Sequence, residues 1–296
     1  MILTVKGRQL RGDLIKSVIL RSDLAPIPVT LEAVIRVDDD LAKSLAEGQT
    51  IEVGGDKMYI VKSHLANNRN SQGEHEYKAV QITAYLDNVH QTSFVLRNAI
   101  TKENVTLQQI YKATGATLQA IDNDIQVKKF YCYAGNYPTL DIAMTLQCEG
   151  GVVRWKKGKM EYKRVQDLFK QKGSITLADN SMTDLDSGFL ERHTIPSYYS
   201  IAPNGTFVYG NKNKTRSAVF VPDKDERQLQ NMSRVLINRK TAKIGFDTRL
   251  CAGDLIDVQG GKPLVIITAA HVFQTGTDDG SSGSQFTKLW LGDINE

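Results

Sequence analysis

The residues of this sequence that could carry nucleophilic or metal chemistry are few and widely separated. No two cysteines form a Cys-x-x-Cys pair, and their odd number favours free structural thiols over a disulfide framework or a zinc site. The histidines lack the HxH or HxxxH spacing of a metal site, so we predict no metal and no cofactor. The residues are Cys132, Cys148 and Cys251, with His64, His75, His90, His193 and His271.

Two constellations could still support catalysis. Cys251 precedes His271, and a thiol beside an imidazole base can act as a nucleophile. The segment TDLDSGFLERH offers Asp184, Asp186 and Glu191, with His193 beside them, as carboxylates for glycoside hydrolysis. We interpret Cys251 as a small residue before a glycine turn and the acidic residues as a solvated loop. No phosphate-binding, dinucleotide-binding, zinc-protease, esterase or EF-hand motif is found, so we predict no enzyme and no catalytic residue.

Composition is that of an ordinary globular protein. The chain has 296 residues and a net charge of +4, which predicts about two domains and allows, without requiring, anionic partners. It contains no apolar run of about 18 residues and no signal-peptide core at its start, so we expect cytosolic synthesis and no membrane contact. The strand KKFYCY (128–133) fits single-stranded nucleic acid only weakly, and we interpret it as a buried aromatic strand.

The elements that would position these residues are mainly strands in the first part of the chain. Alternation predicts strands over 14–21 and 28–37 and a hairpin over 50–65, with Gly54-Gly55 at its turn. A short helix over 39–48 and a further strand over 77–87 complete a small barrel or curved sheet.

The middle part predicts helix, strand, helix and hairpin. Thr106 and Gln109 form a capping box for a helix that Gly115 ends, and a strand follows over 126–135. Residues 138–148 form a second helix, which we expect to be buried on most sides because almost no polar face remains. Its apolar residues are Leu140, Ile142, Ala143, Met144 and Leu146.

That second helix leads into the stretch CEGGVVRWKKGKMEYKR, a double glycine followed by a hairpin rich in lysine. Val153 and Trp155 fall on one face of its first strand, and Met160 and Tyr162 on one face of its second. We interpret its basic residues, like those of YGNKNKTRS (209–217), as a solvated turn.

The last part is β-rich again. Asn204-Gly205 predicts a hairpin over 197–210, and two strands with a glycine turn follow within 253–273. A helix is expected from Asp223, with Glu226 in a capping box and with Leu229 and Met232 directed inward. Residues 275–285 read as a flexible loop, and 286–293 as a last strand or tail.

These segments together resemble the hub proteins of phage baseplates and the related hub part of type VI secretion VgrG spikes. The resemblance lies in LDIAMTLQCEGGVVRWKKGKMEYK, in the preceding TLQQIYKATGA, and in FDTRLCAGDLIDV and EGQTIEVGGDKMYIVKS, which occur in the family's order. The chain lacks the long C-terminal β-prism repeat of the secretion spikes and has no evident lysozyme-like insertion.

The resemblance implies a mixed β fold with an α+β insert. Residues 1–92 would form a first barrel-like hub domain, 93–172 a small α/β insert, and 173–296 a second barrel-like hub domain with a flexible tail. It implies a homotrimer that adapts the hexameric tail tube to the trimeric central spike of a contractile tail, with other baseplate proteins as neighbours. DNA would pass through the lumen only as cargo, and the protein would reside in the virion after synthesis in the host cytoplasm.

No residue is assigned a catalytic role, and three aromatic residues are candidate interface contacts: Trp290, Trp155 and Tyr162. Burial within the subunit is the favoured interpretation for Trp155 and Tyr162, and docking onto a neighbour for Trp290. Two other functions stay open: a tail-associated cell-wall hydrolase using the acidic residues above, and a non-trimeric tail-tip module. The latter would bind a host glycan through Tyr198 and Tyr199 or through residues 275–285.

Overall fold

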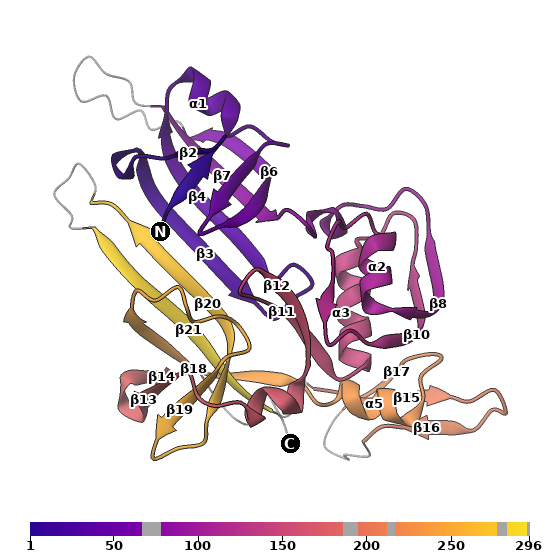
Figure 1. Ribbon diagram of the computed structural model, residues 1–296. Coiled ribbons are helices and arrows are strands. Elements are labelled where there is room, and N and C mark those ends of the chain that lie inside the picture. Colours follow the sequence, from indigo (N-terminus) through magenta and orange to yellow (C-terminus); the bar gives the residue numbers. More distant parts are fainter. Residues whose placement is uncertain (67–77, 186–194, 212–216, 277–282, 295–296) are drawn as a thin grey trace.

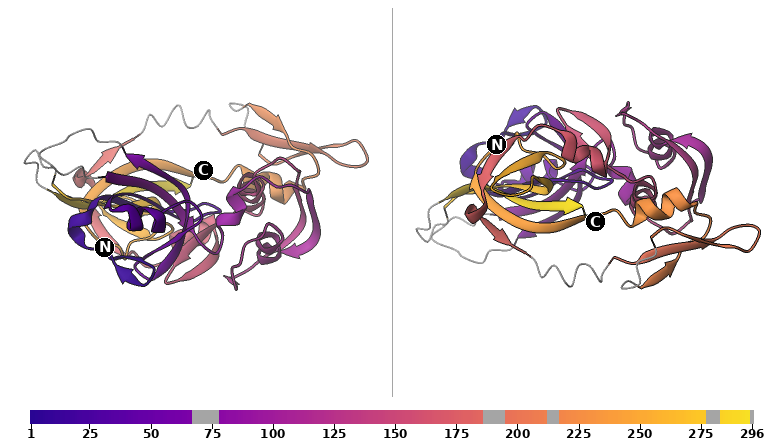
Figure 2. Two further views of the ribbon diagram at one scale, coloured as in Figure 1. Left: turned by 90° about the horizontal axis from the view of Figure 1, so that it is seen from above. Right: turned by 90° about the horizontal axis from the view of Figure 1, so that it is seen from below.

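A computed structural model shows an elongated molecule with a curled sheet at one end and a smaller α/β body at the other (Figure 1). Seen from above and below, the sheet curls round on itself, and the α/β body lies to one side of it (Figure 2). The expected mixed β fold with barrel-like parts and a small α/β insert is confirmed. The structure describes residues 1–66, 78–185, 195–211, 217–276 and 283–294.

The first half of the curled sheet comes from the start of the chain, where alternating apolar residues face the core. The expected strands and the hairpin at Gly54-Gly55 are confirmed, and α1 (Asp39–Ser44) is the expected short helix. The strands are β1 (Leu3–Val5), β2 (Arg8–Gln9), β3 (Ile15–Asp23), β4 (Val29–Val37), β5 (Thr50–Val53), β6 (Asp56–Ala66) and β7 (Lys78–Leu86).

The second half comes from the end of the chain and completes a sheet of 13 strands among the described residues. Strand β20 pairs antiparallel with β3, from Thr268 opposite Asp23 to Gln274 opposite Ser17, so this ladder joins the two halves. The strands are β13 (Ile175–Ala178), β14 (Met182–Asp184), β18 (Leu236–Gly245), β19 (Leu255–Gln259), β20 (Leu264–Gln274) and β21 (Ser284–Ile294).

The middle of the chain forms the α/β body. The capping box of α2 is confirmed, with Thr106 accepting from the Gln109 amide, and Gly115 has the expected positive φ of 93°. Two strands of this body were not predicted: β8, which pairs with β10, and the very short β9. The elements are β8 (Ile100–Thr106), α2 (Leu107–Ala113), β9 (Ile121–Asp122), β10 (Gln126–Cys132), α3 (Pro138–Cys148), β11 (Gly151–Lys156) and β12 (Lys159–Arg164).

A further three-stranded sheet, β15–β17, packs beside this body through α5. The side-chain amide of Gln147 donates to the Met232 carbonyl, and the side-chain amide of Asn231 donates to the Cys148 carbonyl. These two bonds fix α5 on the end of α3. The sheet and helix are β15 (Ser197–Ile201), β16 (Phe207–Tyr209), β17 (Ala218–Phe220) and α5 (Glu226–Met232). Short 3-10 helices η1 (Gly12–Leu14), η2 (His90–Ser93), η3 (Val165–Lys170) and η4 (Asp179–Ser181) complete the fold.

Two sequence predictions about helices were wrong. Helix α3 is not buried on most sides: Leu140 and Met144 are 65% and 44% exposed, while Ile142 and Leu146 face the core. Helix α5 begins two residues later than expected. Asp225 is its N-cap and Gln228 completes the capping box, because the Gln228 side chain accepts from the Asp225 amide. Its Leu229 and Met232 are buried as predicted.

The hydrophobic core runs without a break from the first half of the sheet into the α/β body. One buried cluster contains Leu31 and Ile60 from the sheet together with Phe130 and Ile142 from the body. A separate cluster, which includes Ile256 and Leu289, fills the second half of the sheet. Among the described residues, no helix is long and apolar enough to cross a membrane.

Candidate functional site

The hairpin β11–β12 is the point where the three parts of the molecule meet, and its two faces differ in chemistry. On one face Val153 lies opposite Tyr162, and Trp155 lies opposite Met160. Val153, Met160 and Tyr162 are buried in the large core, and Trp155 packs against it. This face ties the hairpin to the first half of the sheet.

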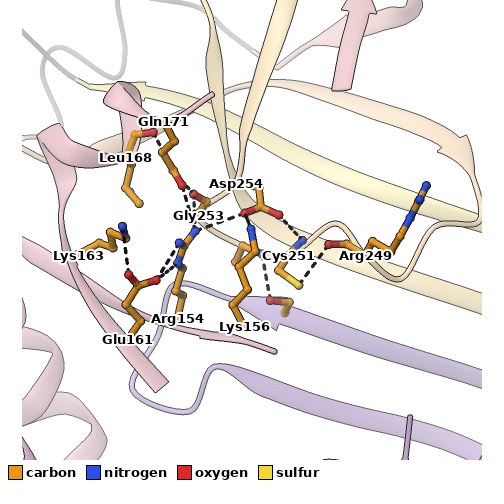
Figure 3. Close-up of polar contacts among 12 residues, drawn as sticks. Arg154, Lys156, Glu161, Lys163, Leu168, Gln171, Arg249, Cys251, Gly253 and Asp254 are labelled. Carbon is orange, nitrogen blue, oxygen red and sulfur yellow. Dashed lines mark hydrogen bonds and ion pairs between the residues drawn. The ribbon is translucent and has the colours of Figure 1, made fainter. Parts of the chain in front are cut away.

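The other face of the hairpin carries a buried ion network, whose centre is Arg154 (Figure 3). The Arg154 side chain is 5% exposed, and its Nε donates to Glu161 Oε2 at 2.8 Å. Its Nη1 reaches across to the second half of the sheet, at 3.0 Å from the Gly253 carbonyl and 3.3 Å from Asp254 Oδ1. The Lys156 ammonium donates to the same Asp254 oxygen, and the other oxygen of Asp254 accepts from the Cys251 amide.

The charges of this network stabilise one another away from solvent. Burial works against ionisation of Glu161, but hydrogen bonds from Arg154 and from Lys163, at 3.1 Å, outweigh it and lower the pKa of the carboxyl. Glu161 is therefore ionised at neutral pH. Asp254, only 2% exposed, receives two cationic donors, so removal of the carboxylate would leave buried positive charge without compensation. The prediction that the basic residues of this hairpin are a solvated turn is wrong for Arg154, whereas Lys157 and Lys159 are exposed.

Glycine residues allow these close approaches. Gly253 has φ of 83°, and a Cβ there would lie 2.8 Å from Arg154 Cδ. In the double glycine, Gly150 has φ of 68° and faces Asn231, while a Cβ on Gly151 would lie 2.3 Å from the ring of Tyr162. The double glycine therefore turns the chain out of α3 and leaves room for Tyr162 beneath it.

The three aromatic interface candidates do not form one surface. Tyr162 is buried, donates to the Glu149 carbonyl at 3.0 Å, and burial raises its pKa to about 12. Trp155 is half-buried on the same hairpin face. Trp290 lies on β21, opposite Thr241 and Thr268, half-buried with the Lys288 ammonium 4.8 Å from its ring centroid.

The geometry gives Cys251 and His271 separate partners. Burial raises the pKa of the Cys251 thiol, which lies 3.7 Å from the Arg249 carbonyl. Burial lowers the pKa of His271, whose Nδ1 lies 3.0 Å from Thr287 Oγ1. A protonated thiol is a poor nucleophile. Within the described ranges, no group of three or more His, Cys, Asp or Glu residues could hold a metal ion.

The acidic residues considered for glycoside hydrolysis are described only in part. Asp184 lies at the end of β14 and forms an ion pair with Lys240 at 2.9 Å. Asp186, Glu191 and His193 lie outside the described residues.

The structure also shows two exposed apolar surfaces, of which the sequence pointed only to Tyr198 and Tyr199. One is the aromatic face of the β15–β17 sheet, where the ring centroid of Tyr199 lies 5.5–6.0 Å from the ring centroids of three neighbours. These neighbours are Phe207, Tyr209 and Phe220, all more than 40% exposed. The other is the outer face of α3, which carries Leu140 and Met144 four residues apart. Strand β10 also contributes to the surface, because Phe130 is buried but Tyr131 is exposed.

Comparison with known proteins identifies the fold. No protein-family model matches the sequence, and no curated protein matches it. A tail protein from Neisseria meningitidis has a similar structure, with a TM-score of 0.63 at 11% identity over 99% of this chain and 95% of that one. The 43 kDa tail protein of prophage MuSo2 from Shewanella oneidensis gives 0.59 at 12% identity over 98% and 96%.

A third similar structure comes from a secretion system. The E. coli c3393 protein is a type VI secretion component with structural similarity to the T4 tail proteins gp27 and gp5. It gives a TM-score of 0.58 at 12% identity, over 99% of this chain and 77% of that one. The resemblance noted from the sequence is thus confirmed at the level of the fold, which extends over the whole chain.

Proposed function

We propose that this chain is a structural baseplate hub, a trimer that adapts a hexameric tail tube to a trimeric central spike. The observation that carries the proposal is a fold shared over 95% or more of both this chain and two tail proteins, one of them from a prophage. In this assignment residues 1–92 and 173–296 are the two hub domains, and residues 93–172 brace them. The protein would act in the virion tail, with the tube, the spike and other baseplate proteins as partners and DNA passing only as cargo.

The chemistry of the described residues supports a structural role. The most elaborate polar site, the Arg154 network, joins elements about 100 positions apart in the sequence and presents no activated nucleophile. The exposed rings of the β15–β17 sheet and the outer face of α3 are surfaces that a neighbouring subunit would cover, because monomeric proteins rarely expose large apolar patches. Trp290 is proposed as a further contact residue. No observation favours the hydrolase alternative.

Sedimentation over a range of concentrations tests the proposal. We expect a species of three times the 32.9 kDa subunit mass that persists on dilution. A monomer or a dimer at every concentration, with or without a trimeric spike protein added, would contradict the trimeric hub.

The aromatic face of the β15–β17 sheet favours a second candidate, a glycan-binding tail-tip module. Tyr199, at the centre of this face, was one of the two tyrosines considered for glycan binding, and exposed rings are suited to stacking on sugars. Titration with host cell-wall oligosaccharides should then show saturable binding that a Tyr199→Ala variant loses.

A further inference from the structure

A small apolar cavity opens where α3, the double glycine and the joined halves of the sheet meet. Its volume is about 240 Å³, and its walls include Leu146 of α3, Val152 of the hairpin, and Leu24 and Ile267 beside the β3–β20 ladder. A cavity of this size accepts one bulky aliphatic or aromatic side chain, and its lining would contact that side chain on several sides.

A basic groove continues from this cavity across its rim. The groove has a volume of about 210 Å³ and shares Gly150, Val165 and Arg234 with the cavity. Two further arginines, Arg164 and Arg227, line it. Three guanidinium groups thus surround one depression whose floor opens into apolar space.

The one carboxylate in the groove already has hydrogen-bond partners within the chain. Among the described residues, Glu149 is the one acidic residue that lines it, and both of its carboxylate oxygens accept hydrogen bonds. Oε2 accepts from Arg227 at 2.9 and 3.0 Å, and Oε1 accepts from Gln228 at 3.1 Å. Arg164 and Arg234 are exposed and form no ion pair within the described part of the chain. The groove therefore offers a ligand two guanidinium groups that have no ion-pair partner among the described residues.

We infer that this cavity and groove form a docking site for an acidic segment of a partner protein, with one large apolar side chain in the cavity. Guanidinium groups bind carboxylates with two parallel hydrogen bonds, which gives the arginines both affinity and orientation. The adjoining apolar cavity distinguishes such a peptide from nucleic acid, which would need stacking surfaces along the groove. This inference does not depend on trimer formation, because all the residues named belong to one subunit.

Selection from a displayed library of random heptapeptides, with the full chain as bait, tests the inference. We expect the enriched peptides to carry Asp or Glu on either side of a Leu, Ile, Met or Phe. By fluorescence anisotropy, one selected peptide should bind the Arg164→Gln/Arg234→Gln variant at least tenfold more weakly than the original chain. An Ala143→Phe variant, which would fill the cavity, should weaken binding by a similar factor.

Matched controls separate this site from general charge effects. Arg8→Gln changes an exposed arginine of β2, and Ala120→Phe adds an exposed ring elsewhere in the α/β body. Both should leave the affinity unchanged, and all variants should keep the sedimentation behaviour of the original chain. Failure to enrich any peptide, enrichment of uncharged peptides, or equal affinity in all variants would overturn the inference. So would displacement of the peptide by single-stranded DNA or by anionic lipid vesicles at lower concentration than by free peptide.

Discussion

Asp254 stabilises the contact between the hairpin and the second half of the sheet, since Arg154 and Lys156 both donate to it. Removal of one partner of a buried ion pair typically costs about 3–5 kcal/mol. We therefore expect Asp254→Ala to lower the free energy of unfolding by about 3 kcal/mol in urea titrations. Asp13→Ala is the control, because Asp13 pairs with Arg11 where both side chains are exposed, and it should change stability by less than about 1 kcal/mol. Equal losses in the two variants would contradict the role of the network.

His271 should make stability depend on pH. Burial lowers the pKa of this imidazole from its ordinary value of 6.5, so the folded state favours the neutral ring. As pH falls through 6.5, the unfolded chain binds the proton first, and the free energy of unfolding should decrease. Thermal unfolding at a series of pH values should show a flatter dependence for His271→Gln than for the original chain. Parallel curves would show that His271 is not the group responsible.

How far a residue's role could be predicted depends on the distance to its partners in the sequence. Thr106, Gln109 and Gly115 were predicted correctly, because a capping box and a C-terminal glycine involve residues within one short segment. The partner of Arg154 could not be predicted, since Asp254 lies 100 positions away and a buried arginine has no local signature. The Arg154 network was found only when the fold placed Arg154 and Asp254 side by side.

At the level of elements, the hairpin β11–β12 packs one apolar face against the large core and bonds to the second half of the sheet through its ionic face. Its register places the ring of Tyr162 over Gly151, where a Cβ would lie 2.3 Å from the ring. We expect Gly151→Ala to displace Tyr162 and to cost about 2 kcal/mol, within the range for overpacking a core. Gly12→Ala is the control, because nothing lies within 4 Å of its Cβ position. Chemical denaturation of both variants measures the difference, and a stable Gly151→Ala protein would contradict this account of the double glycine.

Many strands and turns could be predicted from local alternation and turn residues, whereas the contacts that each element makes with the rest of the molecule could not. Strands β3, β4, β5, β6, β7, β19 and β20 and the turn at Asn204-Gly205 were predicted because their signals are local, whereas β1, β2, β13, β14 and β18 were not predicted. The prediction that α3 is buried on most sides was wrong. Its composition leaves almost no polar face, but only one side of the helix meets the core. The N-cap of α5 was misplaced because Asp223 and Asp225 both suit that position, and only Asp225 accepts from an amide three residues on.

At the scale of the whole molecule, the two ends of the chain build one sheet. The ladder between β3 and β20 joins residues about 250 positions apart, and the hairpin holds both halves from the side. Repeated alternation suggested two β-rich parts, but no local pattern could show that they pair edge to edge. A continuous sheet with a braced junction is a stiff scaffold, which is what the proposed trimeric hub would need for its subunits to meet in fixed geometry.

The outer face of α3 provides the last prediction, because exposed leucine and methionine on a rigid scaffold favour burial against a neighbour. We expect Leu140→Ser/Met144→Ser to leave the free energy of unfolding within about 0.5 kcal/mol, since surface substitutions rarely change it more. The same variant should weaken self-association at least tenfold in sedimentation. Ile142→Ser, which lies between these two residues in the sequence but is buried, should instead destabilise the fold. If the double variant assembles as the original chain does, this face is not a subunit contact, and the aromatic face of β15–β17 becomes the surface to test.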